Sequence, residues 1–263
     1  MAHRRSGSGP AVVLLHGIPG QGRAWDRVDA ALFGSFDVVV PDLIGFGASA
    51  GPTAPTIESV GPAAQAAGVA RLLDDLGVRG ATVVGHDFGA PVGVLLAEAR
   101  PDLVGALSLL SGNTFPDTPI PFPLSLANAP VLGTLASRTL FSSASLRVML
   151  RQGTGPGSPP PDPAVYLGDR RQRRTIRVIF SGALTRLAEV YSPVAAALRS
   201  LEMPVLVGWG DCDPFFPVEQ AERTAAAAPA RLHVFSGAGH FLPHERPTEV
   251  AREIAEFATP TRR

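Results

Sequence analysis

Short apolar runs alternate with longer amphipathic stretches along most of this 263-residue chain. The first run, Ala11-Val12-Val13-Leu14-Leu15, is continuously apolar and of strand length, as expected of a parallel strand that is buried on both faces. The helical stretches are rich in alanine and leucine and end at glycine or before proline. Strands that alternate with helices predict an α/β fold with a mostly parallel, doubly wound sheet. The predicted strands are 11–15, 37–40, 81–85, 104–110, 205–208 and 232–235, and the predicted helices are 25–33, 63–76, 90–99, 218–228 and 248–257.

The alternation is interrupted between residues 111 and 201. This segment contains a Gly/Pro-rich stretch over 153–163 and helical patterns around 126–150 and 170–191. Because the alternation resumes afterwards, we interpret the interruption as a helical lid inserted into one core, and not as a second domain. The predicted organisation is a first part of the core at 1–111, the lid at 112–201 and a second part of the core at 202–263.

The predicted strand at 81–85 stops abruptly at Gly85-His86-Asp87-Phe88-Gly89, where a helical pattern begins. In hydrolases with a Gly-x-Ser-x-Gly sequence, the turn that carries the nucleophile is so sharp that small residues must flank it two positions away. Gly85 and Gly89 occupy those positions, and Asp87 stands where the serine would be. We therefore interpret this turn as a nucleophile elbow that carries aspartate. The alternative is an ordinary helix N-cap, a position that Asp favours.

Four motifs, taken in order, resemble those of the α/β-hydrolase superfamily, and in particular its aspartate-nucleophile branch of epoxide hydrolases and haloalkane dehalogenases. The resemblance spans nearly all of the chain and implies an α/β-hydrolase fold in which nucleophile, acid and histidine follow one another in sequence. The motifs are His16-Gly17-Ile18-Pro19-Gly20, the elbow, Trp209-Gly210-Asp211-Cys212-Asp213-Pro214 and Gly237-Ala238-Gly239-His240-Phe241.

The N-terminal end departs from the family pattern. Members usually have an antiparallel hairpin before the first parallel strand, whereas ten residues precede Ala11 here. We therefore expect an abbreviated edge and a sheet of six or seven strands, in which residues 2–5 could supply one short strand.

An aspartate nucleophile restricts the electrophile. Its carboxylate is ionised at pH 7, because the reference pKa is about 3.9, and it needs no base in order to attack. Attack on an ester or amide carbonyl would give a mixed anhydride, whose formation is unfavourable in free energy. Attack on a tetrahedral carbon instead gives a stable alkyl ester. Asp87 therefore predicts an sp3 electrophile such as an epoxide or an alkyl halide, followed by hydrolysis of the ester.

Hydrolysis of that ester needs a base that activates water, and His240 is the predicted base. It follows the last predicted strand on a glycine loop that can bring an imidazole over the elbow. His16 and His86 lie inside turn motifs and are expected to brace them. His244 is expected at the surface or in a supporting position.

The base in turn needs a carboxylate that orients it. Asp211 and Asp213 both follow the predicted strand at 205–208. The resemblance places the acid on Asp213, which leaves Asp211 as a loop-capping residue, with the reversed assignment as the alternative. Asn113, beyond the strand at 104–110, marks a place where some relatives carry their acid, but it is uncharged and cannot act as one.

The tetrahedral intermediate requires hydrogen-bond donors for its negative charge, and the resemblance assigns them to the backbone N–H groups of Ile18 and Phe88. In the dehalogenases, a Trp after the nucleophile and a Trp or Asn in the first turn typically hold the departing halide. This chain has Phe88 and Ile18 at those places, and Trp25 and Trp209 are expected to pack in the core.

Epoxide hydrolases use tyrosines of the lid as hydroxyl donors to the epoxide oxygen. Both tyrosines of this chain, Tyr166 and Tyr191, lie in the predicted lid. Tyr191 matches the position of the second family tyrosine, and Tyr166 matches the first less well. The alternative for either residue is that its ring merely packs.

Composition narrows the choice of partners. Hydrophobic residues make up 45% of the chain and charged residues 17%, which excludes a disordered protein. The chain has 23 Lys and Arg residues in total and 23 Asp and Glu residues in total, so its formal net charge is zero. There is therefore no electrostatic argument for nucleic acid or an anionic membrane as a partner. We expect a small hydrophobic substrate, and we expect the arginine run over 170–177 to be solvated. Candidate pocket-lining residues of the lid are Phe115, Phe122, Phe141 and Phe180.

The resulting expectation is a cofactor-independent epoxide hydrolase without a metal, with a haloalkane dehalogenase or a non-catalytic ligand-binding protein of the same fold as alternatives. Cys212 is the single cysteine, so no intrachain disulfide can form. We find no signal-peptide pattern and no apolar stretch near the roughly 20 residues of a membrane span, and we expect a cytoplasmic protein. The oligomeric state is left open.

Overall fold

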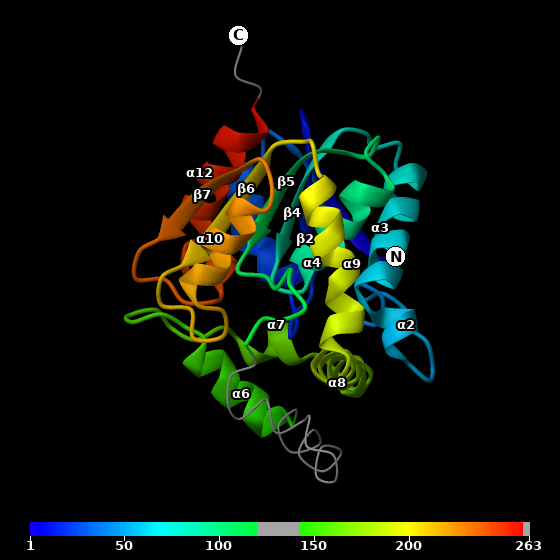
Figure 1. The fold of residues 1–263 in the computed structure, drawn as a ribbon, viewed down its shortest axis with the longest axis vertical. Coiled ribbons are helices and arrows are strands. Elements are labelled where there is room, and N and C mark those ends of the chain that lie inside the picture. Colours follow the sequence, from blue (N-terminus) through cyan, green and yellow to red (C-terminus); the bar gives the residue numbers. More distant parts are fainter. Residues whose placement is uncertain (120–141, 260–263) are drawn as a thin grey trace.

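The computed structural model describes residues 1–119 and 142–259, and within them one seven-stranded sheet forms the centre of the molecule (Figure 1). The strand order is β1-β3-β2-β4-β5-β6-β7. β1 pairs antiparallel with β3, and the other five pairings are parallel. This confirms the predicted α/β-hydrolase fold. The strands are β1 (His3–Gly7), β2 (Ala11–Leu15), β3 (Asp37–Pro41), β4 (Ala81–His86), β5 (Val104–Leu110), β6 (Val205–Gly210) and β7 (Ala230–Phe235).

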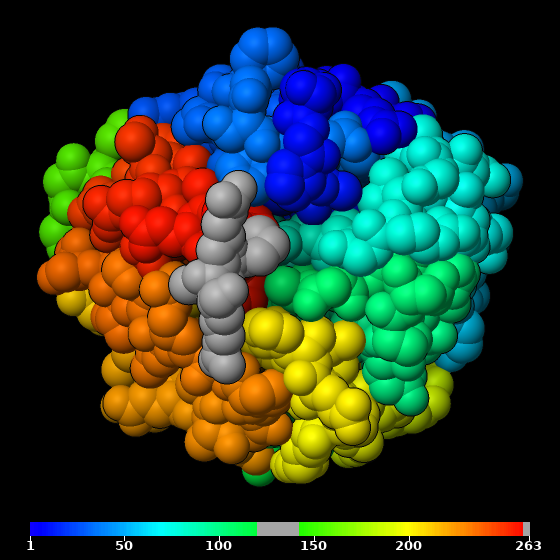
Figure 2. Space-filling view, turned by 90° about the horizontal axis from the view of Figure 1, so that it is seen from above, coloured from blue at the N-terminus to red at the C-terminus, as the bar shows by residue number. Residues whose placement is uncertain are grey.

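β1 is the short edge strand that the sequence allowed at residues 2–5. His3 pairs with Pro41 and Gly7 with Asp37, and the Arg5 guanidinium lies 2.7 Å from the Asp37 carboxylate. Figure 2, a view from above, shows the N-terminal residues (blue) at the surface between the C-terminal helix (red) and the cyan helix that follows β3. Charged side chains on an exposed edge strand oppose pairing with another chain.

The sheet is covered on both faces, which explains the continuously apolar strands. Side chains of Val12 and Leu14 pack with Trp25 in one core, whereas those of Val13 and Leu15 belong to the other core. The first core is closed by α1 (Asp26–Leu32), which follows the 3-10 turn η1 (Gly22–Trp25), and by α12 (Pro247–Ala258). The second core is closed by α3 (Pro62–Asp75), α4 (Gly89–Ala99), α9 (Leu187–Ser200) and α10 (Val218–Ala226).

In its described residues, the segment between β5 and β6 consists of helices joined by loops. Figure 1 shows α6 (Ser143–Gln152), α7 (Pro163–Leu167) and α8 (Arg170–Thr185) below the carboxyl ends of the strands. The helical pattern predicted around 170–191 covers α8 and the start of α9, which are separate helices because Arg186 leaves the helical conformation with φ −126° and ψ 37°. The helix predicted over 126–150 falls partly outside the described residues, and its last part belongs to α6. The lid boundaries at 112 and 201 stay a prediction.

Contacts from α8 tie this segment to the core loop that follows β3. Arg171 donates to the carbonyl oxygens of Gly47 and Ser49 at 2.8 Å, and Arg174 donates to that of Thr53. The expectation of a solvated arginine run was therefore wrong for Arg171, which is partly buried and bonds the carbonyl oxygens of a neighbouring loop, whereas Arg174 is exposed.

Two four-residue helices, α2 (Ile57–Val60) and α11 (Leu242–Glu245), were not predicted, since a single turn is too short to show a helical period. In the part of the chain that the structure describes, no helix combines the length and the apolar character that crossing a bilayer requires.

Candidate active site

Asp87 lies on the turn between β4 and α4 with φ +51°, a left-handed conformation that is uncommon outside glycine. A Cβ atom at Gly85 would collide with the Gly89 carbonyl group, and one at Gly89 would collide with the Leu15 carbonyl group. The turn therefore requires glycine at both flanking positions. Phe88 is the N-cap residue of α4, and the Asp87 side chain caps none of its N–H groups. These observations exclude the N-cap interpretation of Asp87.

The turn after β2 supplies a hydrogen-bond donor to Asp87. The Ile18 N–H donates to Asp87 Oδ1 at 2.7 Å. A Cβ atom at Gly17 would lie 2.7 Å from that same oxygen, so glycine permits the close approach. The second predicted donor, the N–H of Phe88, stays a prediction.

His16 braces this turn, as the sequence indicated. Its Nε2 accepts the N–H of Leu43 at 3.0 Å, so its Nδ1 carries the proton and donates to the Gly17 carbonyl oxygen at 2.9 Å. Burial lowers the pKa of His16, which keeps the ring neutral.

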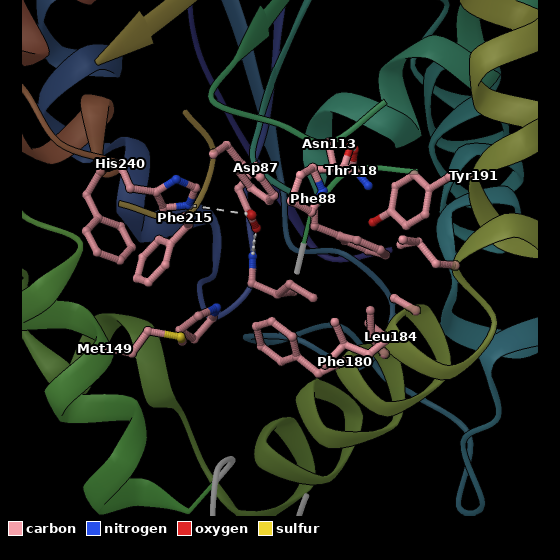
Figure 3. Close-up of a pocket in the computed structure, with 18 residues that line it drawn as sticks. Asp87, Phe88, Asn113, Thr118, Met149, Phe180, Leu184, Tyr191, Phe215 and His240 are labelled. Atoms are coloured by element: carbon pink, nitrogen blue, oxygen red, sulfur yellow. Dashed lines mark hydrogen bonds and ion pairs between the residues drawn. The ribbon is translucent and has the colours of Figure 1, made fainter. Parts of the chain in front are cut away.

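His240 lies between two carboxylates (Figure 3). Its Nε2 is 3.5 Å from Asp87 Oδ2, and its Nδ1 is 2.9 Å from Asp213 Oδ2. The Asp213 side chain is fully buried, and its second oxygen accepts the N–H groups of Phe215 at 2.8 Å and Phe216 at 3.1 Å. Asp213 thus fixes the imidazole with Nε2 directed at Asp87.

Asp211 does not contact His240. It is exposed, and its carboxylate accepts the N–H of Gly237 at 2.7 Å and the hydroxyl of Ser236 at 3.3 Å. This is the loop-capping arrangement that the sequence suggested for Asp211.

The charges of the site favour an imidazolium between two carboxylates. Burial opposes charge on His240, but the charges and hydrogen bonds of Asp213 and Asp87 outweigh it and raise the pKa of His240. Burial likewise opposes charge on Asp87, but hydrogen bonds from His240 and Ile18 lower its pKa overall. Once Asp87 is esterified, one of the two negative charges disappears, so the pKa of His240 must fall.

His86 supports the loop of His240 from inside the core. Its Nε2 lies 2.8 Å from the backbone oxygen of His240 and donates to it, and its ring centroid is 5.1 Å from that of His240. Burial, followed by the neighbouring His240 charge, lowers the pKa of His86 to about 4, so this ring is neutral at pH 7.

Asp87 and His240 face a mostly apolar pocket, with Tyr191 on the opposite side and its hydroxyl oxygen pointing inward (Figure 3). Tyr191 comes from α9 and is 7% exposed. Burial and then the Asp87 charge raise its pKa, so the phenol keeps its proton at pH 7. The residues that line the pocket are Ile18, Pro19, Asp87, Phe88, Asn113, Thr118, Pro119, Met149, Ile179, Phe180, Ala183, Leu184, Leu187, Tyr191, Phe215, Phe216, His240 and Phe241.

Tyr166, the other predicted hydroxyl donor, is not among the residues that line the pocket. It lies buried in α7, and its ring packs edge-on against Phe241 with the centroids 5.4 Å apart. Phe241 therefore separates it from the pocket, and the assignment of Tyr166 to the site is corrected.

The predicted aromatic lining holds for one of its four members. Phe180 lines the pocket, whereas Phe115 packs under the Arg223 guanidinium, 3.8 Å from it. Phe122 and Phe141 lie outside the described residues. The pocket is also lined by three phenylalanines that were not predicted, although their positions just after Asp213 and His240 could have pointed to them: Phe215, Phe216 and Phe241.

Neither tryptophan lines the pocket. Trp25 and Trp209 are fully buried, and the indole N–H of Trp209 donates to the Phe216 carbonyl oxygen at 2.8 Å. Across residues 1–119 and 142–259, no group of three or more His, Cys, Asp or Glu side chains could hold a metal ion.

Comparisons with known proteins agree with the fold. A family model described as alpha/beta hydrolase fold matches residues 10–247. An uncharacterised protein of Mycobacterium tuberculosis is 30% identical over 99% of this chain and 78% of its own length. Epoxide hydrolase A of the same organism is 28% identical over 95% of this chain and 90% of its own. The solved structure of the epoxide hydrolase CorEH is 25% identical, covers 97% of this chain and 93% of its own, and superimposes with a TM-score of 0.78.

Proposed function

Because the chain belongs to the alpha/beta hydrolase fold family and is a hydrolase of that family, we propose that it opens hydrophobic epoxides to vicinal diols through an ester at Asp87. One observation carries the proposal. A carboxylate with a bound N–H donor and a protonated phenol face each other across an apolar pocket, with a histidine-aspartate pair beside the carboxylate. The similarity to epoxide hydrolase A and to CorEH supports the same activity.

In the proposed first step, the Asp87 carboxylate attacks an epoxide carbon and the carbon–oxygen bond of the ring breaks. The departing oxygen takes the proton of Tyr191, so an ester and a neutral hydroxyl group form. The Tyr191 phenolate is reprotonated at the expense of the His240 imidazolium, whose pKa falls because Asp87 has lost its charge. This transfer leaves His240 neutral and able to act as a base.

In the second step, His240 takes a proton from water, and the resulting hydroxide attacks the carbonyl carbon of the Asp87 ester. The N–H of Ile18 is placed to bind the oxygen that becomes negatively charged, since it already donates to Asp87 Oδ1. The intermediate expels the diol oxygen, which takes the proton of the Asp87 carboxyl group. The carboxylate is restored with one oxygen from water, and His240 is again an imidazolium.

The purified protein is expected to convert styrene oxide to its diol and to release no halide from 1-chlorobutane or 1-bromobutane above the uncatalysed rate. The reason is that a departing halide needs N–H donors, whereas both tryptophans lie away from the pocket. Chromatography of the diol and ion chromatography of halide measure the two activities. Halide release without diol formation would favour a haloalkane dehalogenase.

Tyr191→Phe is expected to slow esterification of Asp87 by about 10²- to 10⁴-fold and to leave hydrolysis of the ester nearly unchanged, since general acid catalysis is typically worth that much. Rapid quenching followed by mass analysis of the protein separates the two steps. Tyr166→Phe is the matched control, because that hydroxyl lies outside the pocket lining. Equal loss in both variants, or no loss in Tyr191→Phe, would contradict the proposed acid.

A further inference from the structure

Asn113 lines the same side of the pocket as Tyr191 (Figure 3), and its hydrogen bonds fix which way its amide points. Its Oδ1 accepts the backbone N–H of Phe115 at 3.0 Å and the Thr118 hydroxyl at 2.6 Å. A backbone N–H can only donate, so the atom that it meets must be the amide oxygen. The other end of the side chain is then the NH₂ group, which has donors and no acceptor.

Asn113 and Tyr191 both line the pocket, and Figure 3 shows the two side chains next to each other. Burial raises the pKa of Tyr191, and Asn113 opposes that shift, as a hydrogen-bond donor near the phenol oxygen would. With the amide oxygen occupied by Phe115 and Thr118, the NH₂ group is the part of Asn113 that is left for Tyr191. In a hydrogen bond between these neighbours, the Tyr191 oxygen is therefore the acceptor. The hydroxyl hydrogen of a phenol lies close to the ring plane, so it can point to either of two sides of the oxygen. When a hydrogen-bond donor occupies one of these sides, the hydroxyl hydrogen takes the other.

We infer that Asn113 is a positioning residue that donates to the Tyr191 oxygen and so directs the Tyr191 proton into the pocket. The inference deepens the proposed function and rests on it for its catalytic consequence. Asp87 and His240 are the charged groups that line the same pocket, and Tyr191 faces them from α9. If the Tyr191 hydroxyl hydrogen pointed at Asn113, it could not be donated to the substrate. When it points into the pocket, it is available to the oxygen of an opening epoxide.

The arrangement of donors and acceptors on Asn113 and Tyr191 also determines which substrate groups this side of the pocket can bind. On this side of the pocket Tyr191 offers an O–H group, and Asn113 offers no free acceptor, because its oxygen already has two donors. A neutral hydrogen-bond acceptor such as an epoxide oxygen suits this side, whereas an alcohol or ammonium group would find no acceptor on Asn113.

The test reads the hydrogen bond of Tyr191 directly and needs no turnover. The chain has two tyrosines, so Tyr166→Phe leaves Tyr191 as the sole source of tyrosine Raman bands. The intensity ratio of the tyrosine Fermi doublet depends on whether the phenol oxygen accepts or donates. In the Tyr166→Phe protein we expect the ratio of an accepting phenol, and a ratio of a purely donating phenol would overturn the inference.

Adding Asn113→Asp to that protein replaces the NH₂ group by an acceptor and keeps the oxygen that Phe115 and Thr118 require. The Tyr191 proton should then turn toward the introduced carboxylate, so the doublet should change to the donating ratio. An unchanged ratio would also overturn the inference. Thr118→Val is the matched control, because the Phe115 N–H still fixes the amide, and its doublet should match that of the parent protein.

A second readout asks whether Asn113 acts through Tyr191. In rapid quenching with styrene oxide, Asn113→Asp should slow Asp87 esterification by about 10²- to 10⁴-fold. The double variant with Tyr191→Phe should be no slower than Tyr191→Phe alone, since two residues that act as one unit are not additive. Multiplied losses would contradict a positioning role. Failure of the wild-type protein to form any ester would refute the proposed function, whereas the Raman result would still decide the inference.

Discussion

Asp87→Asn is expected to abolish diol formation, with a loss of about 10⁴- to 10⁶-fold, the range seen when a covalent catalytic residue is removed. The amide has nearly the shape of the carboxylate and can still accept the Ile18 N–H, so binding of substrate should survive. It is uncharged, however, and a poor nucleophile toward an sp3 carbon. Initial rates of diol formation from styrene oxide provide the measurement.

Asp211→Asn is the matched control for this substitution. Asp211 lies on the same loop as Asp213, but it is exposed and bonds Gly237 and Ser236. Its replacement should leave the rate within a few fold of the wild-type value. An Asp87→Asn protein that retained a tenth of the wild-type rate would show that Asp87 is not the nucleophile.

His240→Gln is expected to trap the ester, because Asp87 can attack without a base whereas water cannot. Hydrolysis should slow by about 10²- to 10⁴-fold, the usual contribution of a general base. Removing the imidazolium also removes the proton that returns to Tyr191, so the ester should form more slowly than in the wild-type protein but still accumulate. Intact-protein mass after mixing with styrene oxide should show one added substrate molecule per chain.

The control for this variant is His244→Gln. That ring is partly exposed, and its Nε2 bonds the backbone oxygen of Pro159, away from Asp87. No ester should accumulate in His244→Gln. If His240→Gln lost turnover and formed no adduct, His240 would be required for esterification of Asp87. This result would contradict the proposal that Asp87 attacks without a base and that His240 serves as the base in ester hydrolysis.

The parts of the fold and site that the sequence predicted are those with local causes. The strand at 11–15 is found with the predicted bounds, because a run that is buried on both faces is continuously apolar. The turn at Asp87 was predictable because its backbone geometry demands glycine on both sides. His240 was predictable because it directly follows the glycine-containing loop after β7, a pattern that is visible in the local sequence.

The parts that the sequence missed depend on contacts between distant segments. The sequence ranks Tyr191 above Tyr166 only by their match to family positions. The structure separates them, because Tyr166 packs against Phe241 and does not line the pocket. Likewise, Asn113 carries no motif, and its significance comes from the donors of Phe115 and Thr118 and from α9, which brings Tyr191 beside it. Periodicity and turn chemistry contain no information about such pairings.

The position of α8 against the core is a further property that only tertiary contacts reveal. Gln172 of α8 donates to the Gly20 carbonyl oxygen at 2.9 Å and accepts the N–H of Gly47 at 3.1 Å. It therefore bridges the turn that holds Ile18 and the loop after β3. A glutamine in an arginine-rich helix gives no sign of this bridge in the sequence.

The covalent route through Asp87 is the central claim, and a single turnover in heavy-oxygen water tests it most directly. With enzyme in excess over styrene oxide, the first diol should contain only ordinary oxygen, since its new oxygen comes from the Asp87 carboxylate. The label should appear in the peptide that contains Asp87, and it should enter the diol only in later turnovers. Heavy oxygen in the diol of the first turnover, with none in Asp87, would mean that water attacks the epoxide directly and would contradict the ester.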